Sequence, residues 1–369
     1  MNEQDVLVKR VEPVWALTKR VYVDGIGELA GIVEVARKEV GSQLVSPPLA
    51  LLLERDEEKG IRVELAMPAN RSAQRRGYTL QEIPPDHVLS TVHVGPYRGG
   101  EEGKNLIDTV RAVWAFIGER QLLAGDNPSR YVFLEGPEVH GEDATLYRTE
   151  IQVSYHLPVW QASLETGVRR AAGDDAAAAV MAGQQELEGS YDADSIRNWV
   201  LGAVRRLDET PMGEPSRDGI LQDCAHHYPQ IQLKRLREAY DEIGDLRSFI
   251  DRLREDRALF PATIWLDESG ERPLVYIQRS VPPWNREAYD ATDDPVEKRY
   301  HSCFCVMVRE AIRTGETVSP SFCNCSGGWF VQMWEAILDR RLPVEVVESV
   351  LRGDDRCLFA VCIPPELLC

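Results

Sequence analysis

Alternation of apolar and polar residues predicts that the first part of the chain contains the same unit twice. In each unit, a segment with the spacing of an amphipathic helix stands between segments with the two-residue period of β-strands. The first unit runs strand, helix, strand, strand over residues 7–23, 27–40, 49–55 and 61–67, and the second over 87–94, 101–122, 130–135 and 147–155. We therefore expect a duplicated βαββ domain.

The closing strands of the two units can be aligned, and the alignment brings two glutamates into register. Residues 62–67 align with residues 148–153, so that Glu64 falls opposite Glu150. Because side chains alternate along a strand, the apolar neighbours share one face and both glutamates share the other. If a pseudo-twofold axis relates the units, the two glutamates flank a central groove.

The rest of the chain has a different pattern. Composition shifts between Pro158 and Met181, where the chain is rich in Ala, Gly and Asp. A helical region, a hairpin, two helices and two closing strands are predicted over 194–255, 262–279, 295–314, 327–339, 344–351 and 357–363. We expect an α+β protein with a small-molecule-binding domain over 1–158, a linker and helix start over 159–190, and a cysteine-rich α+β domain over 191–369.

Charge excludes several classes of protein. Lys plus Arg number 42 and Asp plus Glu number 60, which gives a net charge of −18. A surface that neutralises phosphates needs a basic excess, so nucleic acid is not an expected partner. No apolar run approaches the roughly 18 residues of a membrane span, and the start lacks the apolar core of a signal peptide. We expect a cytoplasmic protein without a membrane partner and, since phosphate-loop and dinucleotide motifs are absent, without a nucleotide cofactor.

The cysteines form the main chemical signal of the second part. All eight lie from Cys224 onward, and four of them form two C-x-C pairs, Cys303 with Cys305 and Cys323 with Cys325. Three interpretations stay open: a zinc or similar metal site, a thiol cluster that faces a substrate, and buried cysteines without a chemical role. On a regular helix Cys303 and Cys305 would point about 200° apart. If both bind one ion, this stretch cannot be regular helix.

Residues 5–158 resemble a GyrI-like small-molecule-binding domain of the SOUL type, which is also the effector-binding half of multidrug-sensing regulators. The resemblance rests on the doubled unit, on the sequence HVGPY at 93–97, and on TEIQV at 149–153. It implies a groove lined by aromatic residues, with an acidic side chain at the position of Glu150. Some stand-alone members are similar to hydrolases that open strained, DNA-alkylating rings with a glutamate and aromatic residues.

Glu150 is the candidate catalytic residue. A carboxylate in an aromatic, water-poor groove pairs with a cationic ligand, binds a donor of the ligand, or acts as a base. The alternative is that Glu150 pairs with Arg148 or Arg62 on a solvated sheet. The candidate ligand-binding residues are Trp15, Glu64, Tyr97, Tyr131, Phe133, Tyr147 and Glu150.

Two of these aromatic residues, Tyr131 and Phe133, share a strand face. Alternation places Tyr147 on the face opposite Glu150, which weakens its place in the set.

Residues 190–365 resemble the small-molecule-binding domain of the 4-vinyl-reductase type and its relatives, which include L-2-amino-thiazoline-4-carboxylic acid hydrolase-like proteins. The closing sequence GDDRCLF at 353–359 carries most of the likeness. It implies zinc held by an acidic residue and cysteines near this hairpin in metal-binding members. Here Ser349 stands where such members have a cysteine, which shifts the expected ligands to Cys303, Cys305, Cys323 and Cys325.

Together these patterns predict a protein that binds an amphipathic or cationic, antibiotic-like small molecule in the N-terminal groove. Its role would be protection, as in drug resistance, by sequestration or by hydrolysis. One alternative is a hydrolase that uses Glu150 as general base, with aromatic neighbours, on a strained electrophile. The other is a thiol- or metal-dependent enzyme centred on the two C-x-C pairs.

Overall fold

The computed structural model describes residues 6–56, 59–99, 105–187 and 192–368. The chain divides into two compact units, residues 1–158 with 189–191 and residues 159–188 with 192–369. Each unit is described by itself below. Both combine helices with an antiparallel sheet, so the protein is α+β, as predicted. Within the described ranges, no helix has the length and apolar character needed to cross a membrane.

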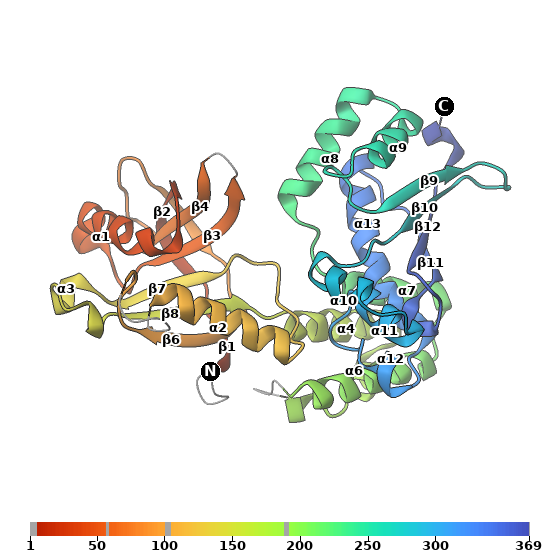
Figure 1. Cartoon of the computed structure of the whole chain (residues 1–369), viewed down its shortest axis with the longest axis horizontal. Coiled ribbons are helices and arrows are strands. Elements are labelled where there is room, and N and C mark those ends of the chain that lie inside the picture. The colour runs from red at the N-terminus through yellow and green to blue at the C-terminus, as the bar shows by residue number, and fades with distance from the viewer. Residues whose placement is uncertain (1–5, 57–58, 100–104, 188–191, 369) are drawn as a thin grey trace. The chain divides into compact units, whose positions relative to one another are not determined.

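Unit 1 is built on one curled antiparallel sheet of eight strands (Figure 1). The strands lie in the order β1-β6-β8-β7-β3-β4-β2-β5. Their bounds are β1 Leu7–Val11, β2 Val14–Val23, β3 Leu49–Asp56, β4 Gly60–Pro68, β5 Thr79–Ile83, β6 Asp86–Val94, β7 Arg130–Glu135 and β8 Arg148–Ser154. The helices are α1 Leu29–Val40, α2 Leu106–Glu119 and the short α3 Pro137–His140.

The duplication predicted from the sequence is confirmed. One half is β2-α1-β3-β4 and the other is β6-α2-β7-β8, and the strand order maps onto itself when the halves are exchanged. The predicted strand 7–23 is two strands, because Pro13, which has no N–H to donate, separates β1 from β2. Strand β1 pairs with β6 and strand β5 pairs with β2, so each leading strand completes the sheet of the other half.

The two faces of this sheet bury different clusters. One face packs against α1 and α2 through side chains such as Leu17, Val63, Leu65, Met67 and Ile151. The face without helices carries a smaller apolar cluster of Ala16, Leu49, Leu51, Ala66 and Ile83. The predicted orientation of the closing strands is therefore confirmed.

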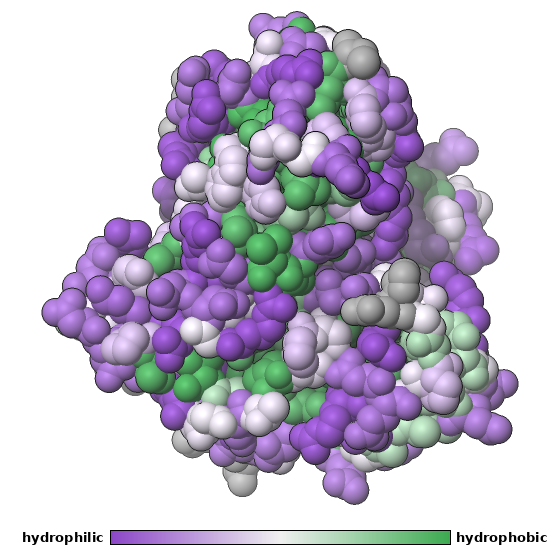
Figure 2. All heavy atoms as spheres, turned by 90° about the vertical axis from the view of Figure 1, so that its right-hand side faces the viewer, coloured by the Kyte–Doolittle hydropathy of each residue, from purple (hydrophilic) through white to green (hydrophobic). Residues whose placement is uncertain are grey.

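Unit 2 is mainly helical, with a four-stranded antiparallel sheet in the order β11-β12-β10-β9 (Figure 1). Helix α13 and helix α9 contribute buried side chains, including Phe249 and Trp334, to a core that they share with this sheet. The helices are α4 Leu157–Ala172, α5 Asp174–Val180, α6 Ala193–Glu209, α7 Glu214–Asp223, α8 Gln230–Ile243, α9 Leu246–Glu255, α10 Arg286–Asp290, α11 Pro295–Ser302, α12 Ala311–Thr314 and α13 Asn324–Leu338. The strands are β9 Thr263–Asp267, β10 Leu274–Gln278, β11 Val344–Glu348 and β12 Leu358–Cys362. On the face that Figure 2 draws, hydrophilic side chains separate the hydrophobic patches from one another.

Two predictions for this part of the chain are wrong in detail. The segment 159–190, expected to be a linker and the start of a helix, already contains most of α4 and all of α5, because its alanines are strong helix formers. The helix expected over 295–314 is interrupted after Ser302, where Cys303 adopts extended backbone with φ −76° and ψ 125°. Helical structure resumes only at α12. The predicted hairpin of β9 and β10 and the two closing strands are confirmed.

Candidate functional site

Glu64 and Glu150 occupy equivalent positions on the helix-free face of unit 1. Glu64 pairs across the sheet with a residue of β2, and Glu150 with the corresponding residue of β6. The same symmetry relates Gln81 of β5 to Lys9 of β1, because each pairs with the equivalent residue of its neighbouring strand. The pseudo-twofold relation predicted for the two glutamates is therefore present in the sheet.

Each of these carboxylates is buried and receives one charged and one neutral donor. Glu150 accepts from the Lys9 ammonium and the Ser90 hydroxyl. Glu64 accepts from Arg20 Nε at 3.1 Å and from Gln81 Nε2 at 2.9 Å. The two carboxylate side chains are both 11% exposed, whereas Lys9 is 39% and Arg20 64% exposed. Lys9 and Arg20 therefore extend from solvent towards the two buried carboxylates. We call them the rim cations, and the partly exposed surface from which they extend is the rim.

The alternative partners predicted for Glu150, Arg148 and Arg62, form ion pairs with other carboxylates. Arg148 donates to Glu135 at 3.1 Å, and Arg62 forms an ion pair with Glu54 at 3.0 Å. Glu150 is thus not part of a solvated ion-pair row along its own strand.

The surroundings of Glu150 are apolar along the sheet. Val92 of β6 and Val132 of β7 flank Glu150 directly, and the apolar cluster of the helix-free face continues from Val132 to Leu49. Towards one end of the same face, Arg130 forms a buried ion pair with Asp86 at 3.5 Å. A flat hydrophobic body placed over this strip would contact aliphatic rather than aromatic side chains.

The predicted aromatic lining is wrong. Tyr97, Tyr131, Phe133 and Tyr147 belong to the core cluster that packs against the helices. The reason is register: Val132 pairs with Glu150, so its neighbours Tyr131 and Phe133 point to the opposite face. The rings contact one another instead, with Tyr97 5.9 Å from Phe133 and 5.3 Å from Tyr147, centroid to centroid.

Trp15 also lies outside the helix-free face. It alternates with Ala16, which faces the helix-free side, and it pairs with Glu82 of β5. The guanidinium of Arg71 lies over its ring at 5.0 Å. Of the seven predicted ligand-binding residues, only Glu64 and Glu150 lie on the helix-free face.

The thiols of unit 2 lie close enough to influence one another. Burial raises the pKa of the Cys325 thiol to about 11 and that of the Cys323 thiol to about 12, and it also raises the pKa of Cys303 and of Cys305. The Sγ of Cys323 also lies 2.8 Å from the hydroxyl of Ser349, the residue at the position where the resemblance implies a cysteine. These thiols are therefore protonated near neutral pH.

The thiol positions differ from those of a formed zinc site. Sulfur ligands about 2.3 Å from one zinc ion lie about 4 Å from one another. Among the described residues, no three sulfurs lie within 4.8 Å of each other. The interruption of the helix at Cys303 does meet the requirement that this stretch is not regular helix. Zinc at Cys303, Cys305, Cys323 and Cys325 remains a prediction.

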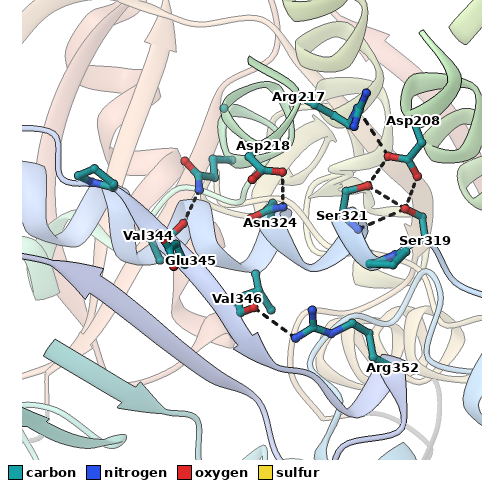
Figure 3. A pocket seen from close by; sticks show the side chains of 14 residues that line it. Asp208, Arg217, Asp218, Ser319, Ser321, Asn324, Val344, Glu345, Val346 and Arg352 are labelled. Atoms are coloured by element: carbon teal, nitrogen blue, oxygen red, sulfur yellow. Dashed lines mark hydrogen bonds and ion pairs between the residues drawn. The ribbon is translucent and has the colours of Figure 1, made fainter. Parts of the chain in front are cut away.

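Unit 2 contains a polar pocket with a volume of about 820 Å³ that was not predicted from the sequence (Figure 3). The side chains of Ser319 and Ser321 both donate to Asp208, and Arg217 lies 3.8 Å from the same carboxylate. Across the pocket, Asn324 donates to Asp218 at 2.7 Å. Its lining, within the described ranges, includes no histidine or cysteine, so the serines have no imidazole base beside them. No spacing in the sequence links α6, α7 and the residues before α13.

No family model and no curated protein matches this chain. Among solved structures, the C-terminal domain of EcmrR is 18% identical, with a TM-score of 0.33, and the match covers 40% of this chain and 95% of that one. SAV2435, solved bound to tetraphenylphosphonium, is 12% identical with a TM-score of 0.31, over 41% of this chain and 93% of that one. A hydrolase from Listeria innocua is 12% identical with a TM-score of 0.27, over 40% and 90%.

Proposed function

We propose that unit 1 binds a lipophilic cation on its helix-free face and holds it by Glu64 and Glu150. The observation that supports this proposal is the pair of buried carboxylates in symmetry-related positions, each neutralised by a cation from the rim. A buried carboxylate is costly without a partner, so the site favours whichever cation reaches it.

A ligand can take the place of the rim cations. Lys9 and Arg20 are flexible side chains that are 39% and 64% exposed, so a competing cation can reach the carboxylates from solvent. A cation with an apolar body would replace one of them and also cover Val92 and Val132, which both keep exposed surface. Burial of apolar surface contributes roughly 25 cal/mol per Å², a gain that the protein's own Lys and Arg do not provide.

Of the two roles predicted for the N-terminal domain, we propose binding, and with it sequestration, rather than hydrolysis. The hydrolytic alternative combines Glu150 with aromatic neighbours, and those aromatic side chains lie on the other face of the sheet. Glu150 contacts the Lys9 ammonium and the Ser90 hydroxyl, and these contacts support a role in binding a cation.

The test is binding of tetraphenylphosphonium by the full chain, measured by calorimetry. Glu150→Gln keeps the shape of the side chain and removes its charge, and we expect affinity about tenfold weaker, which is about 1.4 kcal/mol. Glu64→Gln should weaken binding as well. Glu82→Gln is the matched control, because Glu82 lies on β5 beside Gln81 but on the other face and is exposed. Equal affinity for all variants would contradict the proposal.

A second candidate is a zinc-dependent role for the two C-x-C pairs, and the interrupted helix at Cys303 favours it. Four thiolates are a donor set that zinc prefers, although the sulfurs would have to move closer to bind one ion. If zinc is held here, elemental analysis of the purified protein finds about one equivalent. The double variant Cys303→Ser with Cys323→Ser loses it, and Cys362→Ser on β12 keeps it. Protein purified without zinc that fails to take it up would overturn this candidate.

A further inference from the structure

Arg279, directly after β10, lies in a cage of aromatic rings in unit 2. Its guanidinium carbon is 4.4 Å from the ring centroid of Phe304, 4.9 Å from that of Trp329 and 5.4 Å from that of Phe330. Tyr228 closes the group, since its ring packs edge-on against Trp329 at 5.2 Å. Guanidinium groups stack well on such faces, but a stack of rings supplies no hydrogen-bond acceptor.

The charge of Arg279 has no anionic partner among the described residues. Its side chain forms no ion pair and no hydrogen bond there, and its Nε is buried without an acceptor. The groups that act most strongly on its charge are the thiols of Cys357, Cys303 and Cys325 and the phenol of Tyr228. None of these groups is a carboxylate.

A second donor in the same cage also lacks an acceptor. The indole Nε1 of Trp329 is buried and makes no hydrogen bond with the described residues. Unpaired buried donors are rare in folded proteins, because burying a donor without an acceptor is costly. Two of them beside one cation indicate a missing acceptor that carries negative charge.

The cage is reachable from solvent. Arg279, Phe304 and Trp329 each keep part of their surface exposed, although Arg279 Nε and Trp329 Nε1 themselves are buried. Trp284, which is 68% exposed, packs edge-on against Phe304 at 5.8 Å and extends the aromatic surface outwards. A ligand can therefore follow aromatic side chains from the surface to the guanidinium.

We propose that this cage is a second small-molecule site, in which Arg279 binds the carboxylate of a small organic anion and the surrounding rings hold its flat apolar body. The planar fork of the guanidinium suits a carboxylate, which accepts two parallel hydrogen bonds. The site is independent of the cation site proposed for unit 1. It selects ligands of the opposite charge.

The experiment is calorimetric titration of the full chain with benzoate, with its neutral analogue benzamide, and with inorganic phosphate. We expect benzoate to bind at millimolar concentration or better, and benzamide at least about tenfold more weakly. Arg279→Met should weaken benzoate binding about tenfold or more, whereas Arg286→Met, a control at an exposed arginine of the same unit, leaves it unchanged. Phosphate binding tighter than benzoate binding would overturn the choice of a carboxylate with a flat body.

Thermal unfolding without ligand supplies a readout that does not depend on the probe. Because Arg279 is unpaired, Arg279→Met should leave the melting temperature unchanged or raise it. A large fall, accompanied by loss of thiolate absorbance in the ultraviolet, would show that a thiolate already neutralises Arg279 and would overturn the proposal. Failure of the wild-type chain to bind benzoate at all would overturn it too.

Discussion

Glu64 and Glu150 stand in equivalent places but have different charged partners. Glu150 is paired with Lys9, on the edge strand β1, and Glu64 with Arg20, which lies opposite it on β2. A lysine ammonium is a single point charge on a flexible stem, so we expect it to be easier to displace than Arg20, which lies directly opposite Glu64 and donates to it through Nε. We therefore expect a cationic ligand to bind first at Glu150.

Lys9 competes with such a ligand, and its removal tests this competition. Lys9→Met should strengthen tetraphenylphosphonium binding several-fold, because Glu150 then lacks its own cation. Arg10→Met is the control, since Arg10 lies next to Lys9 on β1 but pairs with the exposed Glu12. Weaker binding by Lys9→Met than by Arg10→Met would show that Lys9 supports the site rather than occupying it. Calorimetry of the three proteins separates the two outcomes.

The buried thiols predict how stability changes with pH. The pKa of Cys325 is raised to about 11 in the folded protein, above the value of an unfolded thiol near 9. The folded state thus holds the Cys325 proton up to a higher pH than the unfolded state does. The stability that this difference gives the folded protein is complete below about pH 9 and is lost as pH rises towards 11. We expect the free energy of unfolding to fall by about 1 kcal/mol per such thiol between pH 7 and pH 10. Urea unfolding at the two pH values measures it, and a smaller fall in Cys325→Ser is the expected control.

Stability that rises between these two pH values would contradict the raised thiol pKa. The sign is informative because a metal-bound or arginine-paired thiolate has a lowered pKa and gives the opposite slope.

Among helices, the contact of α7 with α13 depends on the absence of a side chain. A Cβ at Gly328 would lie 1.9 Å from the carbonyl oxygen of Gln222 and 2.8 Å from the Cβ of Ala225. The backbone of Gln222 would have to move to relieve this clash, so Gly328→Ala should destabilise unit 2 by roughly 2–4 kcal/mol. A Cβ at Gly219, on α7, would have no neighbouring atom within 4 Å, and Gly219→Ala should be neutral or slightly stabilising. Thermal unfolding of both variants checks this packing, and equal melting temperatures would contradict it.

The strands show which features of the fold follow from local pattern. Two-residue alternation identifies β3, β4, β7 and β8, and it places Glu64 and Glu150 on one face because both lie between apolar residues that face the helices. Alternation within a strand does not show which of its residues lie on the same face as a given residue of the neighbouring strand. The sequence therefore leaves Tyr131 and Phe133 grouped with Glu150, and only the pairing of Val132 with Glu150 shows that they belong to the other face.

Non-local pairing explains the other differences. The pairing of β1 with β6 joins residues about 80 positions apart, as in Leu7 with Ser90, and that of β5 with β2 joins residues more than 60 apart, so no local spacing indicates the exchange. The cage around Arg279 likewise joins side chains from the end of β10, from the break after α11 and from α13. In the sequence, a single arginine at the end of a strand does not indicate a binding site. The site is formed only when the fold brings these segments together.

For the whole chain, the net charge of −18 attracts any cation, so affinity alone does not say which part of the molecule holds a ligand. The two units also carry different chemistry. Unit 1 offers buried carboxylates on a helix-free sheet face, and unit 2 offers a guanidinium among aromatic rings that has no ion-pair partner among the described residues. Opposite ligand charges are therefore expected at the two units.

The most direct measurement is a crystal structure of the full chain with tetraphenylphosphonium bound. We expect the phosphonium on the helix-free face of unit 1, over Val92 and Val132, with the Glu150 carboxylate beside it and Lys9 turned away. A cation bound to the helix-packed face beside Tyr97, or in unit 2 with Glu150 still paired to Lys9, would contradict the proposed function.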